Sequence, residues 1–359
     1  MIVRTEEDLA AAIRRAIVPL RIRGGGTRPI GNPVQGAPLT VGLRGITLYE
    51  PGALTLVVRA GTPVAEVEAA LAAEGQRLPF EPMDHRALLG TQGEPTIGGI
   101  VAANVSGPRR LQAGACRDSL IGVRFVDGRG DVIRNGGRVM KNVTGYDLVK
   151  LMAGSHGTLG VLTELSFKVL PAPEAQATLA ADLPLAEAVP LMAAALRTPY
   201  EVTGAGWRAG RVFLRLEGFA ASVAYRVERL AAELPLSLWQ GADPWPGLRD
   251  VTDFAGRAGD VWRISSKATD APALAARIPG EVVLDWGGAL IWALVPAGTD
   301  LRGLLGGFQG HATLIRADEE TRAALGAFHP ESAPVAALAA GLRRQFDPRG
   351  ILNPGLMGA

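Results

Sequence analysis

The sequence predicts an α+β fold in which a glycine-rich first domain is followed by a smaller domain of an open sheet and helices. Its 359 residues are enough for two domains and at least one large core. All six tryptophans lie after Pro171-Ala172-Pro173, which has the composition of a linker. We therefore divide the chain into residues 1–172, residues 173–330 and a C-terminal segment of residues 331–359.

Composition excludes several classes of protein. The formal charge of +2 predicts no broad basic surface for nucleic acid. Acidic residues stand near the N-terminus, where a secretory signal would carry an apolar core. No apolar run approaches the roughly 20 residues of a membrane span. We therefore expect a cytoplasmic protein without a direct membrane span.

Cysteine and histidine are too sparse to predict a metal centre. Cys116 is the only cysteine, which excludes an internal disulfide and also an iron–sulfur cluster held by about four thiolates. The four histidines are scattered, and no carboxylates are paired at ligand spacing. We expect no metal site.

The first domain begins with a helix and a short strand. Thr5 can cap a helix in which Leu9, Ile13 and Ile17 recur at helical spacing. Residues 20–23 then alternate as a strand.

Strands and turns alternate along the rest of the first domain. Residues 54–61 have the composition of a buried strand, and Pro63 then starts a helix. Residues 119–126 form the next expected strand, with a tight hairpin turn over residues 127–130. Residues 165–170 complete the expected strands of this domain.

The second domain is expected to be an open sheet with helices on one face. Helices are predicted over residues 182–196 and 221–234. Strands are predicted over residues 211–217, 261–265, 281–286 and 290–295. An alanine-rich helix over residues 334–346 begins the tail, which ends in a turn fixed by prolines and glycines.

Three glycine-rich stretches of the first domain suggest a bound ligand. Gly98 and Gly99 lie in residues 95–107, where small residues leave room for a planar group and free N–H groups can face a phosphate. Residues 23–31 contain three consecutive glycines, and residues 154–160 contain three more. Each stretch is also compatible with a turn that binds nothing, and none is a Walker loop or a G-x-G-x-x-G motif.

Taken together, residues 23–28, 95–107, 141–161 and 346–355 resemble the vanillyl-alcohol-oxidase type of FAD-binding domain, also called the PCMH-type domain. The resemblance implies a two-subdomain FAD-binding domain to which the C-terminal tail returns. It also implies that FAD is held by Arg23, Gly24, Gly25, Gly26, Thr27, Arg28, Pro95, Thr96, Ile97, Gly98, Gly99, Ala103, Asn104, Ser106, Gly107, Gly157, Gly160 and Val161.

Two departures from the family pattern bear on mechanism. Many members carry a histidine that bonds covalently to the flavin, and this sequence has Thr27 there, which implies non-covalent FAD. The larger lactate and glycolate flavoproteins carry an H-x-x-G-D-G-N-x-H motif, and this sequence has none. Turnover of substrate by this chain itself is therefore an open question.

Over its whole length the sequence is similar to the small flavin subunits of bacterial glycolate oxidases. That resemblance implies a complex with a second, larger FAD subunit and an iron–sulfur subunit. It implies oxidation of glycolate to glyoxylate, with activity on D-lactate, and allows a peripheral position at the inner membrane through the complex.

Three residues of the second domain are candidates for chemistry on a 2-hydroxy acid. Arg263 and Arg316 can hold a carboxylate, and His311 can act as the base. His311 is also compatible with a histidine that makes one hydrogen bond inside a turn, and Arg263 with a salt-bridged strand residue.

The sequence is compatible with three functions. The chain is a catalytic FAD subunit of a glycolate dehydrogenase complex, a subunit that retains FAD without turning over substrate, or a stand-alone FAD oxidase.

Overall fold

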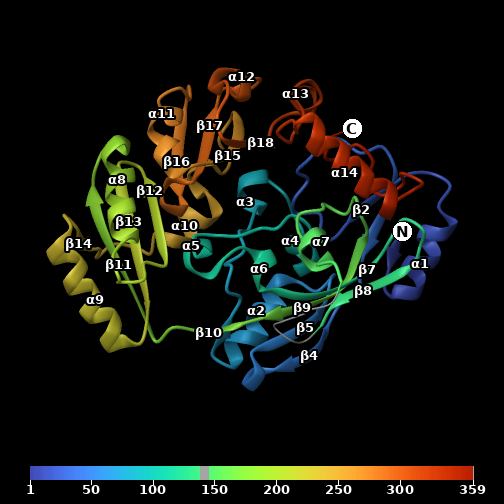
Figure 1. Ribbon diagram of the computed structural model, residues 1–359, viewed down its shortest axis with the longest axis horizontal. Coiled ribbons are helices and arrows are strands. Elements are labelled where there is room, and N and C mark those ends of the chain that lie inside the picture. Colours follow the sequence, from blue (N-terminus) through green and yellow to red (C-terminus); the bar gives the residue numbers. More distant parts are fainter. Residues whose placement is uncertain (138–144, 359) are drawn as a thin grey trace.

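The computed structural model describes residues 1–137 and 145–358, which form two lobes and a C-terminal segment (Figure 1). The mixture of helices and antiparallel sheets confirms the predicted α+β class. The division at residues 172 and 330 stays our proposal for the domain boundaries.

The first lobe contains two sheets, a parallel one of order β1-β3-β2 and an antiparallel one of order β4-β5-β9-β7-β8, besides the β10-β6 pair. Its strands are β1 (Ile2–Val3), β2 (Leu20–Arg23), β3 (Ala37–Val41), β4 (Ile46–Glu50), β5 (Thr55–Arg59), β6 (Gln76–Arg77), β7 (Leu120–Val126), β8 (Val132–Gly136), β9 (Val161–Lys168) and β10 (Leu170–Pro171). Its helices are α1 (Glu6–Arg15), α2 (Val64–Ala73), α3 (Arg86–Leu89), α4 (Ile97–Ala102), α5 (Arg110–Ala113), α6 (Cys116–Ser119) and α7 (Leu148–Met152).

Helix α1 shows how neighbouring residues in the sequence determine where a helix begins. The Thr5 hydroxyl accepts a hydrogen bond of 3.0 Å from the Asp8 N–H and caps α1, as predicted. Leu9 and Ile13 are fully buried, but the prediction that Ile17 belongs to the helix is wrong. The helix ends at Arg15, and the Ile17 side chain is 96% exposed.

The second lobe is built on one antiparallel sheet of order β14-β11-β13-β12-β16-β17-β15-β18. Its strands are β11 (Ala175–Asp182), β12 (Gly204–Arg208), β13 (Arg211–Gly218), β14 (Ser237–Leu238), β15 (Asp260–Ser266), β16 (Glu281–Asp285), β17 (Leu290–Val295) and β18 (Gly310–Arg316). Its helices are α8 (Leu185–Leu196), α9 (Ala220–Glu233), α10 (Trp245–Asp250), α11 (Ala271–Ala275) and α12 (Leu301–Leu305).

The two faces of this sheet join different cores. Helices α8, α9, α11 and α12 pack on one face, and residues such as Trp262 and Ile264 fill the space between them. The other face carries Val261, Trp292 and Ile315, which belong to the same core as the buried residues of the first lobe. The prediction of helices on one face of an open sheet therefore holds for these four helices, whereas α10 packs on the opposite face, where Trp245 and Leu248 join the core shared with the first lobe.

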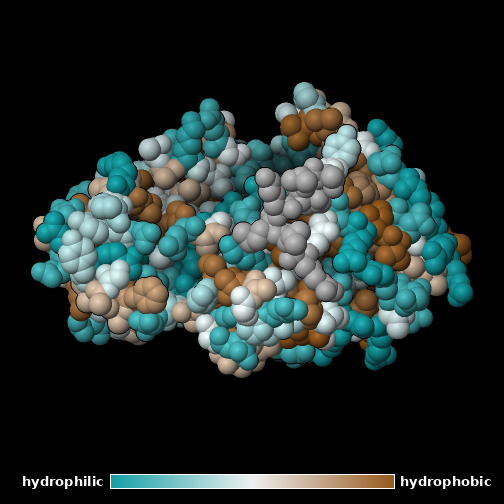
Figure 2. All heavy atoms as spheres, turned by 60° about the horizontal axis from the view of Figure 1, so that its bottom comes forward, coloured by the Kyte–Doolittle hydropathy of each residue, from teal (hydrophilic) through white to brown (hydrophobic). Residues whose placement is uncertain are grey.

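The C-terminal segment returns to the first lobe. Helices α13 (Glu319–Leu325) and α14 (Ala333–Phe346) lead to a tail in which Leu352 pairs with Leu20 beside the parallel sheet. Phe346 lies 6.1 Å from Phe125, measured between ring centres. Hydrophobic residues on the face drawn in Figure 2 form separate groups of limited size, as expected when most apolar side chains lie in the cores.

A buried cluster of five charged residues joins the two lobes. We call Arg77, Glu81, Arg109, Arg215 and Glu217 the inter-lobe ion cluster. Arg215 of β13 donates to both oxygens of Glu81, at 2.8 and 3.0 Å. Arg109 donates to both oxygens of Glu217, at 3.0 and 2.8 Å. Arg77 lies 2.6 Å from Glu217 as well. The carboxylates thus tie together arginines from both lobes.

The pKa of Glu217 shows how strongly the cluster favours the ionised carboxylate. Burial by itself would raise this pKa, but the hydrogen bond from Arg109 and the charges of Arg215, Arg109 and Arg77 lower it from 4.5 to about 2. A shift of this size corresponds to roughly 3 kcal/mol of linked stability. Because the pKa is lower in the folded chain, this contribution is present above about pH 4.5 and is lost as the pH falls toward 2.

We expect Glu217→Gln to lower the free energy of unfolding at pH 7 by roughly 3 kcal/mol, because Arg77 and Arg109 lose the carboxylate to which they donate and only Glu81 is left to balance three arginines. The variant should also lose less stability than the parent protein between pH 7 and pH 3. Urea titrations at both pH values measure the two effects.

Glu281→Gln is the matched control for this experiment. Glu281 also receives two hydrogen bonds from an arginine, Arg257, but both side chains are largely exposed. Its replacement should change stability by less than about 1 kcal/mol. Equal effects of the two substitutions would contradict the role that we assign to the buried cluster.

Candidate functional site

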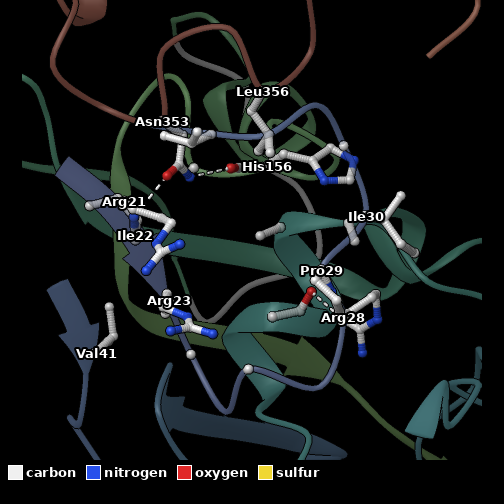
Figure 3. A pocket seen from close by; sticks show the side chains of 18 of the residues that line it. Arg21, Ile22, Arg23, Arg28, Pro29, Ile30, Val41, His156, Asn353 and Leu356 are labelled. Atoms are coloured by element: carbon white, nitrogen blue, oxygen red, sulfur yellow. Dashed lines mark hydrogen bonds between the residues drawn. The ribbon is translucent and has the colours of Figure 1, made fainter. Parts of the chain in front are cut away.

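A cavity of about 450 Å³ lies in the first lobe, between several segments that are distant in the sequence (Figure 3). The connection from β2 to β3 forms one wall, and helix α4 forms another. Residues 156–162, the tail at Asn353 and Leu356, and helix α13 complete it. The volume lies within the range of small-molecule and cofactor sites.

The structure brings most of the predicted cofactor residues to this cavity. Those that line it are Arg23, Gly24, Gly25, Gly26, Thr27, Arg28, Thr96, Gly98, Gly99, Ala103, Gly157, Gly160 and Val161. The glycine-rich stretches therefore converge on one space, as the sequence predicted.

The loop after β2 has a backbone that only glycine permits. A Cβ atom on Gly25 would lie 1.7 Å from the carbonyl oxygen of Glu94, and Gly26 has a φ of +71°. Within residues 1–137 and 145–358, the N–H groups of Gly24, Gly25, Gly26 and Thr27 donate to no protein acceptor. Such unpaired donors along a cavity wall match the acceptor oxygens of a phosphate group.

Arg28 is fixed at one end of the cavity. Its Nη1 donates to the Gly99 carbonyl oxygen at 2.7 Å, and its Nε donates to His85 Nδ1 at 3.2 Å. Burial lowers the pKa of Arg28 to about 10, so the guanidinium is still charged at neutral pH. Burial and the Arg28 charge hold the pKa of His85 well below its usual range, which leaves a neutral ring that can accept the bond.

The C-terminal tail closes the opposite side through Asn353. Its side-chain oxygen accepts a hydrogen bond of 2.7 Å from the Ile22 N–H, and its Nδ2 donates to the His156 carbonyl oxygen at 2.9 Å. Figure 3 shows both bonds next to the cavity. Burial, followed by the charge of Arg28, lowers the pKa of His156 to about 4, so this lining residue is neutral near pH 7.

Positive side chains predominate among the charged residues of the wall. Arg21, Arg23, Arg28 and Arg322 line the cavity with a single carboxylate, Glu319, among its described lining residues. The Nε of Arg322 is buried and has no hydrogen-bond partner among the residues that the structure describes. Together with the unpaired N–H groups, these cations fit a ligand that carries phosphate charge, and FAD carries two phosphates.

Several lining residues were not predicted from the sequence. They are Arg21, Ile22, Pro29 to Val34, Val41, Ala60, Leu162, Glu319, Arg322 and Leu356. Ala102, His156 and Asn353 also line the cavity, and they lie in segments on which the resemblance is based. Arg322 and Glu319 come from a helix almost 300 residues from the glycine loop, so no local pattern marks them.

Five predicted cofactor residues are not among those that line the cavity, and their hydrogen bonds go to other parts of the protein. The Asn104 oxygen accepts from the Arg117 N–H at 3.1 Å, and the Ser106 hydroxyl accepts from the Cys116 N–H at 2.9 Å. The Gly107 carbonyl accepts from Trp286 Nε1 at 3.0 Å. Pro95 and Ile97 anchor the turn before α4 through backbone bonds. The start of the predicted segment 141–161 lies outside the described residues.

The three catalytic candidates lie outside this cavity. Arg316 donates to the carbonyl oxygens of Leu88, Phe254, Arg257 and Gly259, so its guanidinium joins backbone segments and has few donors left for a carboxylate. Arg263 and His311 lie on neighbouring strands β15 and β18, on the sheet face toward the first lobe, where His311 is exposed.

Comparisons with known proteins agree with this geometry. A family model described as an FAD binding domain matches residues 1–136. The chain is 40% identical over 343 residues to glycolate oxidase subunit GlcE of Escherichia coli, which covers 94% of this chain and 92% of that protein. It is 36% identical over 168 residues to glycolate oxidase subunit GlcD of Bacillus subtilis, covering 46% of this chain and 34% of that one.

A solved structure shares the fold. An alkyldihydroxyacetonephosphate synthase aligns with a TM-score of 0.69 over 98% of this chain and 76% of that chain, at 16% sequence identity. This likeness extends over both lobes, which shows that their arrangement is that of a known fold.

We expect Gly99→Val to weaken FAD retention roughly tenfold or more. A Cβ at Gly99 would lie 3.2 Å from Thr96 Oγ1 and 3.5 Å from Arg28 Nη1, and the added methyl groups would crowd the cavity and the bond that fixes Arg28. The measurement is flavin absorbance per protein after gel filtration, with far-UV circular dichroism to confirm folding.

Gly341→Val provides the control, because Gly341 lies in helix α14 with open space around its Cβ position. The control should purify with the flavin content of the parent protein. A folded Gly99→Val protein with unchanged flavin content would show that the cofactor lies elsewhere.

Proposed function

The chain belongs to the glycolate oxidase subunit GlcE family of FAD-dependent oxidoreductases, and from this premise we propose that it is an FAD-binding subunit of a 2-hydroxy acid dehydrogenase complex. The proposed reaction oxidises glycolate to glyoxylate, with D-lactate as a second substrate. FAD is the cofactor. The observation that carries the proposal is the cavity wall of unpaired N–H groups and arginines in a chain that matches this family over 94% of its length.

We propose that FAD is held without a covalent bond. Residues 23–28 contain no histidine, cysteine or tyrosine, and the Thr27 side chain is buried at 4% exposure. His156 lines another wall and is kept neutral by burial.

Acid precipitation tests this attachment. We expect all of the flavin to remain in the supernatant, because phosphate contacts and packing are lost when the protein unfolds. Flavin that stays with the precipitated protein, and resists washing in denaturant, would contradict non-covalent binding.

When bound, FAD supplies a flavin ring that accepts a hydride from the alcohol carbon. Arg263 is the candidate for holding the substrate carboxylate, and His311 for accepting the hydroxyl proton. The His311 ring is partly shielded from water although the residue is exposed, and this shielding, followed by the charge of Arg263, lowers its pKa from 6.5. The ring is therefore unprotonated at neutral pH, as a base requires. Arg316 is left out of this role because backbone carbonyls occupy its guanidinium.

The electrons must leave through another molecule. The sequence has one cysteine, Cys116, and burial raises the pKa of its thiol, which keeps it unreactive. We propose that a larger FAD subunit and an iron–sulfur subunit are the partners that accept the electrons. No helix in the described part of the chain is long and apolar enough to cross a membrane.

One observation favours a second function, in which the chain retains FAD without turning over substrate itself. The H-x-x-G-D-G-N-x-H motif of the larger flavoproteins is absent from the sequence. A stand-alone FAD-dependent oxidase is the third alternative.

Anaerobic mixing of the purified, FAD-loaded chain with glycolate separates these functions. We expect the flavin absorbance to bleach, because the chain carries its own candidates for binding and deprotonating the acid. An unchanged spectrum would favour the FAD-retaining subunit. Rapid hydrogen peroxide formation in air, without partner subunits, would favour the oxidase. Acetate, which has no hydroxyl group to oxidise, serves as the control ligand.

A further inference from the structure

Two arginines from different lobes face the ring of one tryptophan. Arg110 comes from α5 in the first lobe, and its guanidinium carbon lies 4.4 Å from the centre of the Trp286 ring. Arg263 comes from β15 in the second lobe, and its guanidinium carbon lies 5.1 Å from the same centre. We propose that this arginine pair, Arg110 and Arg263, is a binding site for the carboxylate of a small organic acid.

Neither arginine of the pair is in direct contact with a carboxylate among the residues that the structure describes. Neither side chain makes a hydrogen bond or an ion pair with any residue in the ranges 1–137 and 145–358. The neighbouring arginines of the inter-lobe ion cluster, in contrast, all contact Glu81 or Glu217. A partly buried guanidinium without a partner is costly, and a bound anion would offset that cost.

The electrostatics of the surrounding groups support an anion at this position. Burial, and then the charge of Arg110, lowers the pKa of Arg263 to about 10, with Asp285 acting in the opposite direction. Asp285 is a weak counter-ion, because burial raises its pKa to about 7 and its Oδ1 accepts the Trp286 N–H at 2.7 Å. Asp118, whose charge also acts on Arg110, lies 3.7 Å from Arg117, which acts in the opposite direction. The positive charge at the arginine pair therefore exceeds the negative charge near it.

Trp286 is held in place between the lobes. Its Nε1 donates to the carbonyl oxygen of Gly107, in the first lobe, at 3.0 Å. Its backbone has a φ of 54°, a strained conformation for a residue other than glycine, so the contacts around Trp286 must hold it there. The ring is only 6% exposed. A tryptophan fixed in this way holds in one position the ring that both guanidinium groups contact.

Arg263 is close enough to the residues around Arg28 for its charge to act on them. His85 accepts from Arg28 Nε at 3.2 Å, and the charges of both Arg28 and Arg263 lower the pKa of His85. His311, the candidate base, is also close enough for the charges of Arg263 and Arg110 to lower its pKa. A small acid held by the arginine pair would thus lie beside the candidate base and near the cavity that we assign to FAD.

This inference rests on the proposed function only in naming a 2-hydroxy acid as the ligand, so its test uses a probe that cannot react. Oxalate has the size of glycolate but no hydrogen on the carbon that would be oxidised. Isothermal titration of the FAD-loaded chain with oxalate should show saturable binding, and oxalate should raise the melting temperature of the protein. Absence of both effects would overturn the proposal.

Substitutions then locate the site. We expect Arg110→Gln and Arg263→Gln each to weaken oxalate binding roughly tenfold or more, since each removes a charged hydrogen-bond donor. Neither should reduce the melting temperature of the oxalate-free protein much, because no ion pair is lost. Arg110→Lys and Arg263→Lys, which keep the charge, should retain part of the affinity. Unchanged oxalate affinity in the folded glutamine variants would overturn the proposal.

Arg211→Gln is the matched control. Its guanidinium carbon lies 4.7 Å from the ring centre of Trp239, but it is paired with Asp182 and lies far from β15 in the sheet order. It should bind oxalate like the parent protein, and equal weakening in this variant would overturn the proposal.

These experiments distinguish failure of the carboxylate site from failure of the proposed function. Oxalate binding that depends on the arginine pair, without flavin bleaching by glycolate, would support this site and contradict turnover by the chain. Bleaching by glycolate with the same half-saturating concentration in both glutamine variants would support turnover and overturn this site.

Discussion

The inter-lobe ion cluster is the constraint on which the rest of the structure depends. Glu81 and Glu217 each accept two hydrogen bonds from one arginine side chain, and the donors come from both lobes. Glu81 also accepts the Arg109 N–H at 3.0 Å, which fixes the backbone next to Arg110. The position of the second lobe and the start of α5 are thus set by the same carboxylates.

Free energies of ion pairs and of apolar contacts indicate what the inter-lobe ion cluster contributes to the packing of the lobes. A buried ion pair repays much of its own desolvation cost, so its net effect on stability is small compared with that of an apolar core. The shared core, which includes Phe80 and Phe167 from one lobe and Val261 and Trp292 from the other, supplies the main attraction between the lobes. Two apolar surfaces can shift against each other at little cost in free energy. Paired guanidinium and carboxylate groups, in contrast, keep both of their hydrogen bonds in only one relative position of the lobes. We infer that the core holds the lobes together and the cluster determines how they are aligned.

The local sequence predicted helices, strands and the glycine-rich residues that line the cavity better than it predicted the distant segments with which they pack. The Thr5 cap, strand β2 and the glycine stretches carry their signal in adjacent residues, so they were predictable. Strand β11 (Ala175–Asp182) is rich in alanine and β12 (Gly204–Arg208) contains two glycines, which are poor strand formers, so neither was predicted. Their pairing in the sheet overrides this preference. Arg316 was predicted as a candidate for the carboxylate, and no pattern in the sequence indicated its carbonyl partners, because they come from segments far apart in the chain.

Backbone strain shows how the site is assembled. Glu81, Asn104, His156, Trp286 and Asn353 all have positive φ values, and each contacts a distant segment near the cavity or the arginine pair. Such a conformation costs about 1–3 kcal/mol at each residue, so local sequence would not maintain it. The bonds that compensate join residues as far apart as Ile22 and Asn353. The bonds of Asn353 form only when the tail returns to the first lobe, and those of Glu81 and Trp286 form only when the two lobes pack together. The cavity therefore depends on the first lobe and the tail, and the arginine pair depends on both lobes.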